Sequence, residues 1–183
     1  AGIALYVGRG SESPASVKAG YSMNTAGNDG PGVIVTGLLA DEEYISAVGI
    51  DLIEGRNFTR EDLLRLERDT IYSFIVNEAA LSALYITPEN AVGTAVSIFG
   101  RRGEIIGVVG DFHFSSLHNP IGPLVMFPEE RQFDKIFIRL PAGGPSEVSA
   151  KLHNIEKIYR NIITHRPFEY DFLDQQYASL YTA

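Results

Sequence analysis

The sequence predicts an α+β fold in which a β-rich part is inserted into a mixed α/β layer. Short apolar runs suited to strands crowd together between about residues 70 and 130, separated by turn residues. Before and after this region, strand patterns alternate with helix patterns, and the longest helix pattern covers 146–164. We therefore expect one subdomain built from residues 1–60 and 133–183, with a β-rich subdomain, residues 61–132, inserted between its halves.

Composition indicates a soluble globular chain and excludes several functional classes. The 183 residues carry a net charge of −8, and their basic residues are scattered singly apart from Arg101 and Arg102. Binding to a nucleic-acid backbone needs clustered Lys and Arg, so we expect no nucleic-acid partner. Cysteine is absent, which excludes a disulfide, a thiol nucleophile and a thiolate metal site. No stretch approaches the roughly 18 consecutive apolar residues of a membrane-spanning helix.

The first part of the chain alternates short strands with turns. Residues 3–7 and 33–39 are apolar enough for strands. The stretch 8–32 between them is rich in Gly, Ser, Pro and Asn, so we expect a long loop there. Asp41 is expected to cap a short helix over 42–48.

The middle of the chain carries clear helix-capping signals. Thr59 and Asp62 form a capping-box pattern at the start of one helix, and Asn77 is placed to cap a second. The elements expected here are extended chain over 50–53, a helix over 60–68, a strand over 71–76, a helix over 78–85, and a hairpin whose strands, 96–99 and 104–109, flank a four-residue loop.

The stretch 104–128 is the most strongly patterned part of the sequence. Its first apolar run is interrupted by Gly107 and Gly110, where a bulge or a close backbone approach is expected. Residues 111–114 then alternate polar and aromatic types, which predicts a strand with two different faces. A turn-rich corner leads into a second apolar run over 124–127.

The last part of the chain contains the longest predicted helix. A strand is expected over 135–140, the helix over 146–164, a strand over 168–173 and a final helix over 174–180. The long helix has one apolar stripe on an otherwise polar surface, so it should pack against a sheet or another helix. The residues of this stripe are Val148, Leu152, Ile155, Tyr159 and Ile162.

Asp111, His113 and His118 are the best candidates for chemistry. On a strand, Asp111 and His113 would share a face, so the carboxylate could orient the imidazole. His118 could complete a metal site, and Ser115 or Ser116 could serve as a nucleophile. No His-Glu-x-x-His or Gly-x-Ser-x-Gly motif frames them, however. The favoured interpretation is that Asp111 caps a turn and His113 occupies a satisfied or exposed position.

Several short motifs occur in one order along the chain. They are Leu-Ile-Glu-Gly-Arg-Asn-Phe at 52–58, Ile-Val-Asn-Glu-Ala at 75–79, Val-Gly at 92–93, and Ile-Gly-Val-Val-Gly-Asp-Phe-His-Phe-Ser-Ser-Leu at 106–117. Together these residues resemble the extracytoplasmic core domain of MacB-type, FtsX-like ABC transporter permeases, in the branch common in Bacteroidetes-like bacteria. The stretches 168–174 and 177–181 are similar to the end of that domain. The resemblance runs from about residue 33 onward.

The resemblance implies a porter-like α/β subdomain built from both chain ends, with the β-rich subdomain inserted. It also marks a set of residues as structural signatures of the fold, without a catalytic role, a metal or a cofactor. These signature residues are Gly55, Arg56, Phe58, Asn77, Glu78, Gly93, Gly107, Asp111, Phe112 and His113.

The function implied by the resemblance is non-enzymatic. The domain would lie at the periplasmic face of the bacterial inner membrane and couple ATP hydrolysis by a cytoplasmic ABC ATPase to export or mechanotransmission. Its partners would be its own transmembrane helices, expected before residue 1 and after residue 183, a second permease copy, and a periplasmic adaptor or an exported substrate. Two alternatives stay open: a free-standing periplasmic binding module, and a hydrolase or metal enzyme that uses Asp111, His113 and His118.

Overall fold

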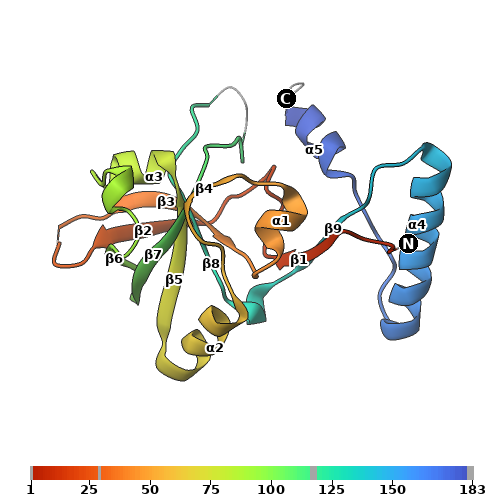
Figure 1. Cartoon of the computed structure of the whole chain (residues 1–183), viewed down its shortest axis with the longest axis horizontal. Helices are drawn as coiled ribbons and strands as arrows, with labels where there is room; N and C mark the ends of the chain where they lie inside the picture. Colours follow the sequence, from red (N-terminus) through yellow and green to blue (C-terminus); the bar gives the residue numbers. More distant parts are fainter. Residues whose placement is uncertain (1, 29, 116–118, 181–183) are drawn as a thin grey trace.

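A computed structural model describes residues 2–28, 30–115 and 119–180 and has the predicted α+β composition. Figure 1 shows a large sheet with α1, α2 and α3 around it, and a smaller region in which α4 stands apart. The strands are β1 (Tyr6–Gly10), β2 (Gly20–Thr25), β3 (Val33–Leu39), β4 (Leu52–Gly55), β5 (Ile71–Asn77), β6 (Ala95–Ile98), β7 (Arg101–Val109), β8 (Leu124–Phe127) and β9 (Lys135–Arg139). The α-helices are α1 (Tyr44–Val48), α2 (Arg60–Asp69), α3 (Glu78–Ala83), α4 (Pro145–Ile162) and α5 (Leu173–Leu180), and the 3₁₀ turns are η1 (Pro88–Asn90) and η2 (Glu130–Gln132).

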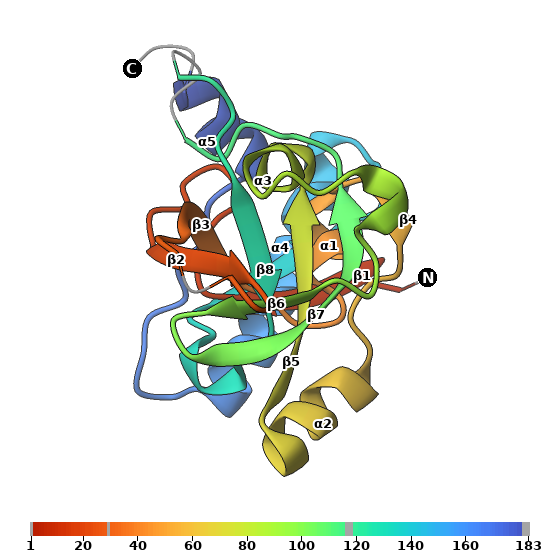
Figure 2. The same cartoon turned by 90° about the vertical axis from the view of Figure 1, so that its left-hand side faces the viewer.

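The large sheet closes on itself into a barrel (Figure 2). Its strands follow the order β4-β7-β5-β8-β3-β2-β6, and an additional pairing joins β6 to β7. The long strand β7 makes closure possible, because its first half pairs with β6 and its second half with β4. We refer to β2, β3, β5, β6, β7 and β8 as the barrel.

Strand alternation divides the buried residues into an inner and an outer core. Along β5, Phe74 and Val76 belong to the inner core, whereas Ile75 between them belongs to the outer one. This is the period-two alternation of a strand that is buried on both faces. The outer core is closed by α1, which contributes Tyr44, and by Phe114 from the segment after β7.

β1 and β9 form a separate antiparallel pair, the ribbon, which leads from the barrel toward α4 (Figure 1). The helix α1 packs closely on one face of it: a Cβ added to Gly8 would lie 2.6 Å from the Cα of Tyr44. The rings of Tyr44 and Phe137 meet edge to face at 4.9 Å. The other face of the ribbon carries exposed apolar side chains, including Val7 and Ile136.

The long helix α4 lies where the sequence predicted a helix, but none of its residues is buried. Its apolar stripe packs against the chain that follows it, with the Tyr159 and Phe168 rings 5.4 Å apart. The predicted sheet or helix partner is therefore replaced by an extended segment. Within the described part of the chain, no helix combines the length and apolar character required to cross a bilayer.

The capping predictions in the middle of the chain are confirmed. The capping box of Thr59 and Asp62 is present, with the Thr59 amide donating to the Asp62 carboxylate at 2.8 Å. Asn77 caps α3 by accepting from the amide of Ala80 at 3.0 Å. These signals act within four residues, so they operate whatever the surrounding fold.

Two predicted loops are wrong. The predicted loop 8–32 contains β2, whose single fully buried residue, Met23, gave too weak a pattern to be recognised. The predicted four-residue hairpin loop is a two-residue turn, because Phe99 and Gly100 adopt positive φ values of 45° and 85°. Such turns match the twist of the paired strands. The residues after Gly100 therefore belong to β7.

Three other strand predictions are also corrected. The strand predicted at 3–7 begins later, at Tyr6. Residues 111–114, which alternate as predicted, and residues 168–173 form no strand. In each case the side chains pack on neighbours while the backbone lacks a partner strand, and alternation alone cannot distinguish these two situations.

The division of the chain into residues 1–60 plus 133–183 and an inserted 61–132 remains a prediction. Strands β2, β3 and β4 precede residue 60 and pair with later strands in the large sheet. Only β1 and β9, from the two ends of the chain, pair apart from that sheet.

Candidate functional site

Asn77 occupies the centre of the signature residues, at the junction of β5 and α3. It is fully buried, and its side-chain oxygen accepts from the amides of Ala80 at 3.0 Å and Leu124 at 2.7 Å. Its side-chain nitrogen donates to Asp111 Oδ1 at 2.7 Å and to the Gly122 carbonyl at 3.0 Å. One amide thereby satisfies four groups from three parts of the chain, which is all that an Asn side chain can do.

Asp111, which lies just after the end of β7, is hydrogen-bonded to the start of α3. Its Oδ1 also accepts from the amide of Ala79 at 3.1 Å, and its own amide donates to Glu78 Oε2 at 3.2 Å. Asp111 thus links the end of β7 to α3 through Asn77, Glu78 and Ala79. The carboxylate lies at the amino end of the helix, where backbone amides lack helical partners.

The segment after Asp111 closes the outer core. Phe114 is 5% exposed and packs edge to face with Phe112, with ring centroids 5.8 Å apart. The carbonyl of Phe114 accepts from the amide of Val17 at 2.9 Å. This segment therefore serves as a packed cover that joins the N-terminal part of the chain to the barrel.

Arg56 and Asp62 form a second polar centre near the other end of β5. The guanidinium binds both carboxylate oxygens, at 2.7 and 2.9 Å. Ser73 Oγ, from β5, donates to the same carboxylate at 2.7 Å. Burial by itself would raise the pKa of Asp62, but the hydrogen bonds from Arg56, Ser73 and Thr59 outweigh it and hold that pKa well below its usual range.

Two signature glycines allow β4 to approach β7. A Cβ on Gly55, whose φ is 73°, would lie 2.3 Å from the carbonyl oxygen of Ile106. A Cβ on Gly107 would lie 2.4 Å from the carbonyl oxygen of Arg56. The register between β5 and β7 shifts beside Gly107, which confirms the predicted bulge.

Part of the candidate chemical site lies within the described residues. Asp111 Oδ1 is engaged by Asn77 and Ala79, His113 is half-buried, and Ser115 is exposed. His118 and Ser116 lie outside the described residues. Among residues 2–28, 30–115 and 119–180, no group of three His, Asp or Glu side chains is arranged to hold a metal ion.

The contact between Asn77 and Asp111 was missed by the sequence analysis. Asn77 was interpreted as a helix cap and Asp111 as a turn residue or a candidate for chemistry, and the resemblance marked both as signatures without pairing them. They are 34 positions apart, and no local pattern links them. A single sequence therefore carried no signal for this contact.

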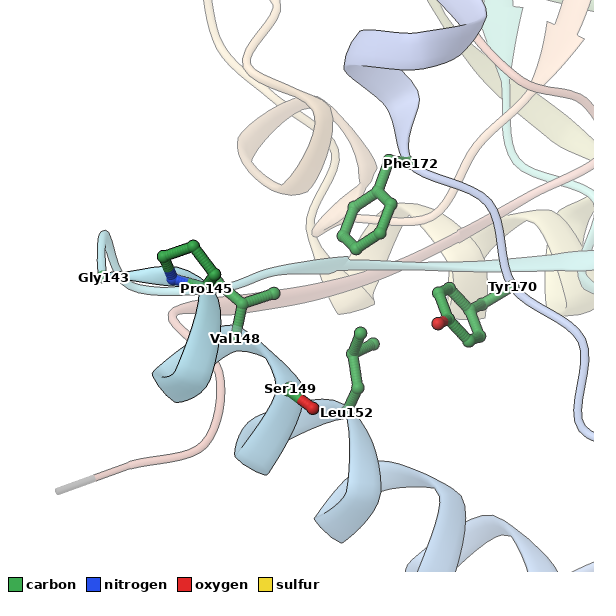
Figure 3. A pocket seen from close by; sticks show the side chains of 7 residues that line it. All are labelled: Gly143, Pro145, Val148, Ser149, Leu152, Tyr170 and Phe172. Carbon is green, nitrogen blue, oxygen red and sulfur yellow. The ribbon is translucent and has the colours of Figure 1, made fainter.

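Two hollows of the described surface lie away from the signature residues. One, of about 420 Å³, lies between α4 and the segment that follows it; Figure 3 shows Val148 and Leu152 of the helix facing Tyr170 and Phe172. A second, of about 440 Å³, lies beside α5 and is lined by polar residues such as Glu12 and Lys18. Both are shallow surface features without a buried charged group.

A comparison with known protein families identifies one that matches most of this chain. Residues 6–155 match the family described as MacB-like periplasmic core domain. No curated protein matches the chain.

Solved structures share the fold at low sequence identity. The periplasmic region of MacB from Actinobacillus actinomycetemcomitans has a TM-score of 0.61 and 16% identity, with 98% of this chain and 78% of that chain covered. The extracellular domain of the transporter YknZ from Gram-positive bacteria has a TM-score of 0.58 and 14% identity, covering 86% and 75%. A domain of a putative permease from Porphyromonas gingivalis has a TM-score of 0.53 and 15% identity, covering 96% and 83%. Because the family match spans most of its length, this chain belongs to the MacB-like periplasmic core domain family.

Proposed function

We propose that this domain is the extracytoplasmic, non-catalytic part of an ABC transporter permease that couples cytoplasmic ATP hydrolysis to export or mechanotransmission. The observation that carries the proposal is the family match over residues 6–155. The likeness to the periplasmic region of MacB and the extracellular domain of YknZ supports it.

The interactions of the signature residues support a mechanical role. Asn77, Asp111, Arg56 and Asp62 direct their polar groups to one another and to backbone atoms. Such saturated networks fix the relative positions of strands and helices. We infer that the signature residues preserve the shape of the barrel, so that motion of attached membrane helices moves it as a unit.

In the proposed assembly, two permease copies act together. Each copy contributes its own transmembrane helices and binds a cytoplasmic ABC ATPase, and a periplasmic adaptor or the exported substrate meets the outer domains. The site of action is the periplasmic face of the inner membrane.

The test measures whether the outer domains respond to nucleotide. Full-length permease and its ATPase are placed in lipid vesicles, with a spin label on each copy at Tyr85→Cys, a position that is 96% exposed. We expect the distance between the two labels to change between the nucleotide-free and ATP-bound states. A distance distribution that is identical in both states, with ATP hydrolysis intact, would contradict coupling through this domain.

A further inference from the structure

We propose that Arg9, Asp41, Arg60 and Glu130 form an ionic clamp that fixes the angle between the ribbon and the barrel. The inference deepens the proposed function, because a fixed angle is needed for motion of the ribbon to reach the barrel undiminished. The four side chains come from β1, the turn before α1, the start of α2 and η2. They are two cations and two anions, so the cluster is electrically balanced.

Arg9 is the ribbon's contribution to the clamp. Its Nε donates to Asp41 Oδ2 at 2.9 Å, and its Nη2 donates to Glu130 Oε1 at 3.1 Å. Its guanidinium also lies 5.3 Å from the centre of the Phe133 ring. The Asp41 amide in turn donates to the Arg9 carbonyl at 3.0 Å, so these two residues are joined through backbone and side chain.

Glu130 connects the ribbon to the barrel side. The oxygen that accepts from Arg9 also accepts from Arg60 Nη1, at 2.7 Å. Arg60 is the first residue of α2, and that helix is anchored to β5 by the bond from Ser73 to Asp62. Glu130 lies in η2, where the chain passes from β8 of the barrel to β9 of the ribbon. One carboxylate oxygen of Glu130 therefore links Arg9 of the ribbon to Arg60 of α2.

The clamp and α1 hold opposite faces of the ribbon. Gly8 and Gly10 face Tyr44, and successive strand residues point to opposite faces, so Arg9 points away from α1. The Tyr44 contact is apolar; the directional bonds on this face are those from Arg139 Nε to the Ala47 carbonyl at 3.2 Å and from the Tyr44 hydroxyl to the Glu12 carbonyl. The bonds of the clamp, on the opposite face of the ribbon, restrict the tilting and twisting that the packing against α1 permits.

The clamp determines orientation more than stability. Arg9 is 42% exposed in its side chain and Glu130 31%, and ion pairs at such positions contribute little to the free energy of unfolding. Removing Glu130 should therefore leave the fold intact while freeing the ribbon. This separates the clamp from the core residues around it.

The test measures the angle in the isolated domain, which has no native cysteine. Spin labels at Val7→Cys on β1 and Tyr85→Cys beside α3 report the distance between ribbon and barrel. A second pair, at Glu67→Cys on α2 and Tyr85→Cys, reports distances within the barrel region. All three positions are exposed.

Glu130→Gln should at least double the width of the ribbon-to-barrel distance distribution, and Arg60→Gln should act in the same direction. The matched control is Glu129→Gln, which removes the neighbouring negative charge that pairs with Arg101 at 2.9 Å, and should leave the distribution as in the wild type. An unchanged distribution in both Glu130→Gln and Arg60→Gln would overturn the proposal. Equal broadening of the Glu67–Tyr85 pair would also overturn it, since the barrel region itself would then have loosened.

The outcome is independent of the test of coupling. These distances are measured without membrane, ATPase or nucleotide, so failure of the clamp would leave the proposed function standing. Failure of nucleotide coupling would likewise leave the clamp as a property of the fold.

Discussion

The barrel and the region of the ribbon and α4 differ in what they bury. The barrel strands supply an inner and an outer core, and residues such as Phe74 and Phe127 are completely inaccessible. The 18-residue helix α4 has no buried residue, and Ile158 and Ile162 on it are exposed by 50% and 76%. The difference indicates that the barrel supplies the stability of this domain. The ribbon region depends on its attachment to α1 and on the clamp for its orientation.

The largest expected loss of stability follows the removal of a side chain from the inner core. Phe74→Ala removes a fully buried ring that packs against Tyr72 and Phe127. The cavity should lower the free energy of unfolding by about 3–5 kcal/mol. Urea denaturation followed by circular dichroism measures this change. A loss below about 1 kcal/mol would contradict the assignment of the stabilising core to the barrel.

Asn77→Ala should have the next largest effect. It leaves the amides of Ala80 and Leu124 without their side-chain acceptor, so we expect a loss of roughly 2–3 kcal/mol in the free energy of unfolding. Hydrogen exchange should also accelerate at the amides of Ala79, which donates to Asp111, and of Val17, which donates to the Phe114 carbonyl. Asn90→Ala is the matched control, because Asn90 is exposed and its side chain bonds only locally to Thr87. Equal losses in both variants would contradict the central role of Asn77.

The sequence predicted the parts of the fold that depend on neighbouring residues. The capping box at Thr59 and the cap at Asn77 act within a few residues, and the strand over 71–76 is an apolar run that needs burial on both faces. Two of the elements that were wrong depend on distant partners. β2 exists because β3 and β6 pair with it, and the segment 111–114 is held by Asn77 instead of by a strand.

The candidate site was predictable only as a set of residues. The motifs identified Asn77, Glu78 and Asp111 as signatures, but their arrangement requires β5 and β7 to lie side by side. The same limit applied to the ionic clamp, since Arg9 and Glu130 are 121 positions apart. Charge pairs of this kind have no periodic pattern, so only the tertiary structure identifies them.

The pH dependence of stability tests the second polar centre. The pKa of Asp62 is lowered in the folded state, so its contribution is complete above the unfolded-state value, near 4, and decreases as the pH falls through and below that value. We expect about 1–2 kcal/mol of the stability at pH 7 to be lost by pH 2 through this group. Unfolding measured from pH 7 to pH 2 should show a shallower loss in Asp62→Asn. A parallel pH profile in the variant would contradict the assigned role.

The smallest change in stability is expected from a substitution in the apolar stripe of α4. Measuring it tests the contrast between the two regions. Leu152→Ala shortens a half-buried side chain that faces Tyr170 and Phe172, in a region without a closed core (Figure 3). Burial contributes in proportion to the apolar area removed from water, so we expect the free energy of unfolding to change by less than about 1 kcal/mol. Hydrogen exchange along α4 should nevertheless increase, because the helix loses part of its packing against the segment that follows it. A loss comparable to that of Phe74→Ala would mean that α4 belongs to a shared cooperative core, and the contrast between the two regions would have to be abandoned.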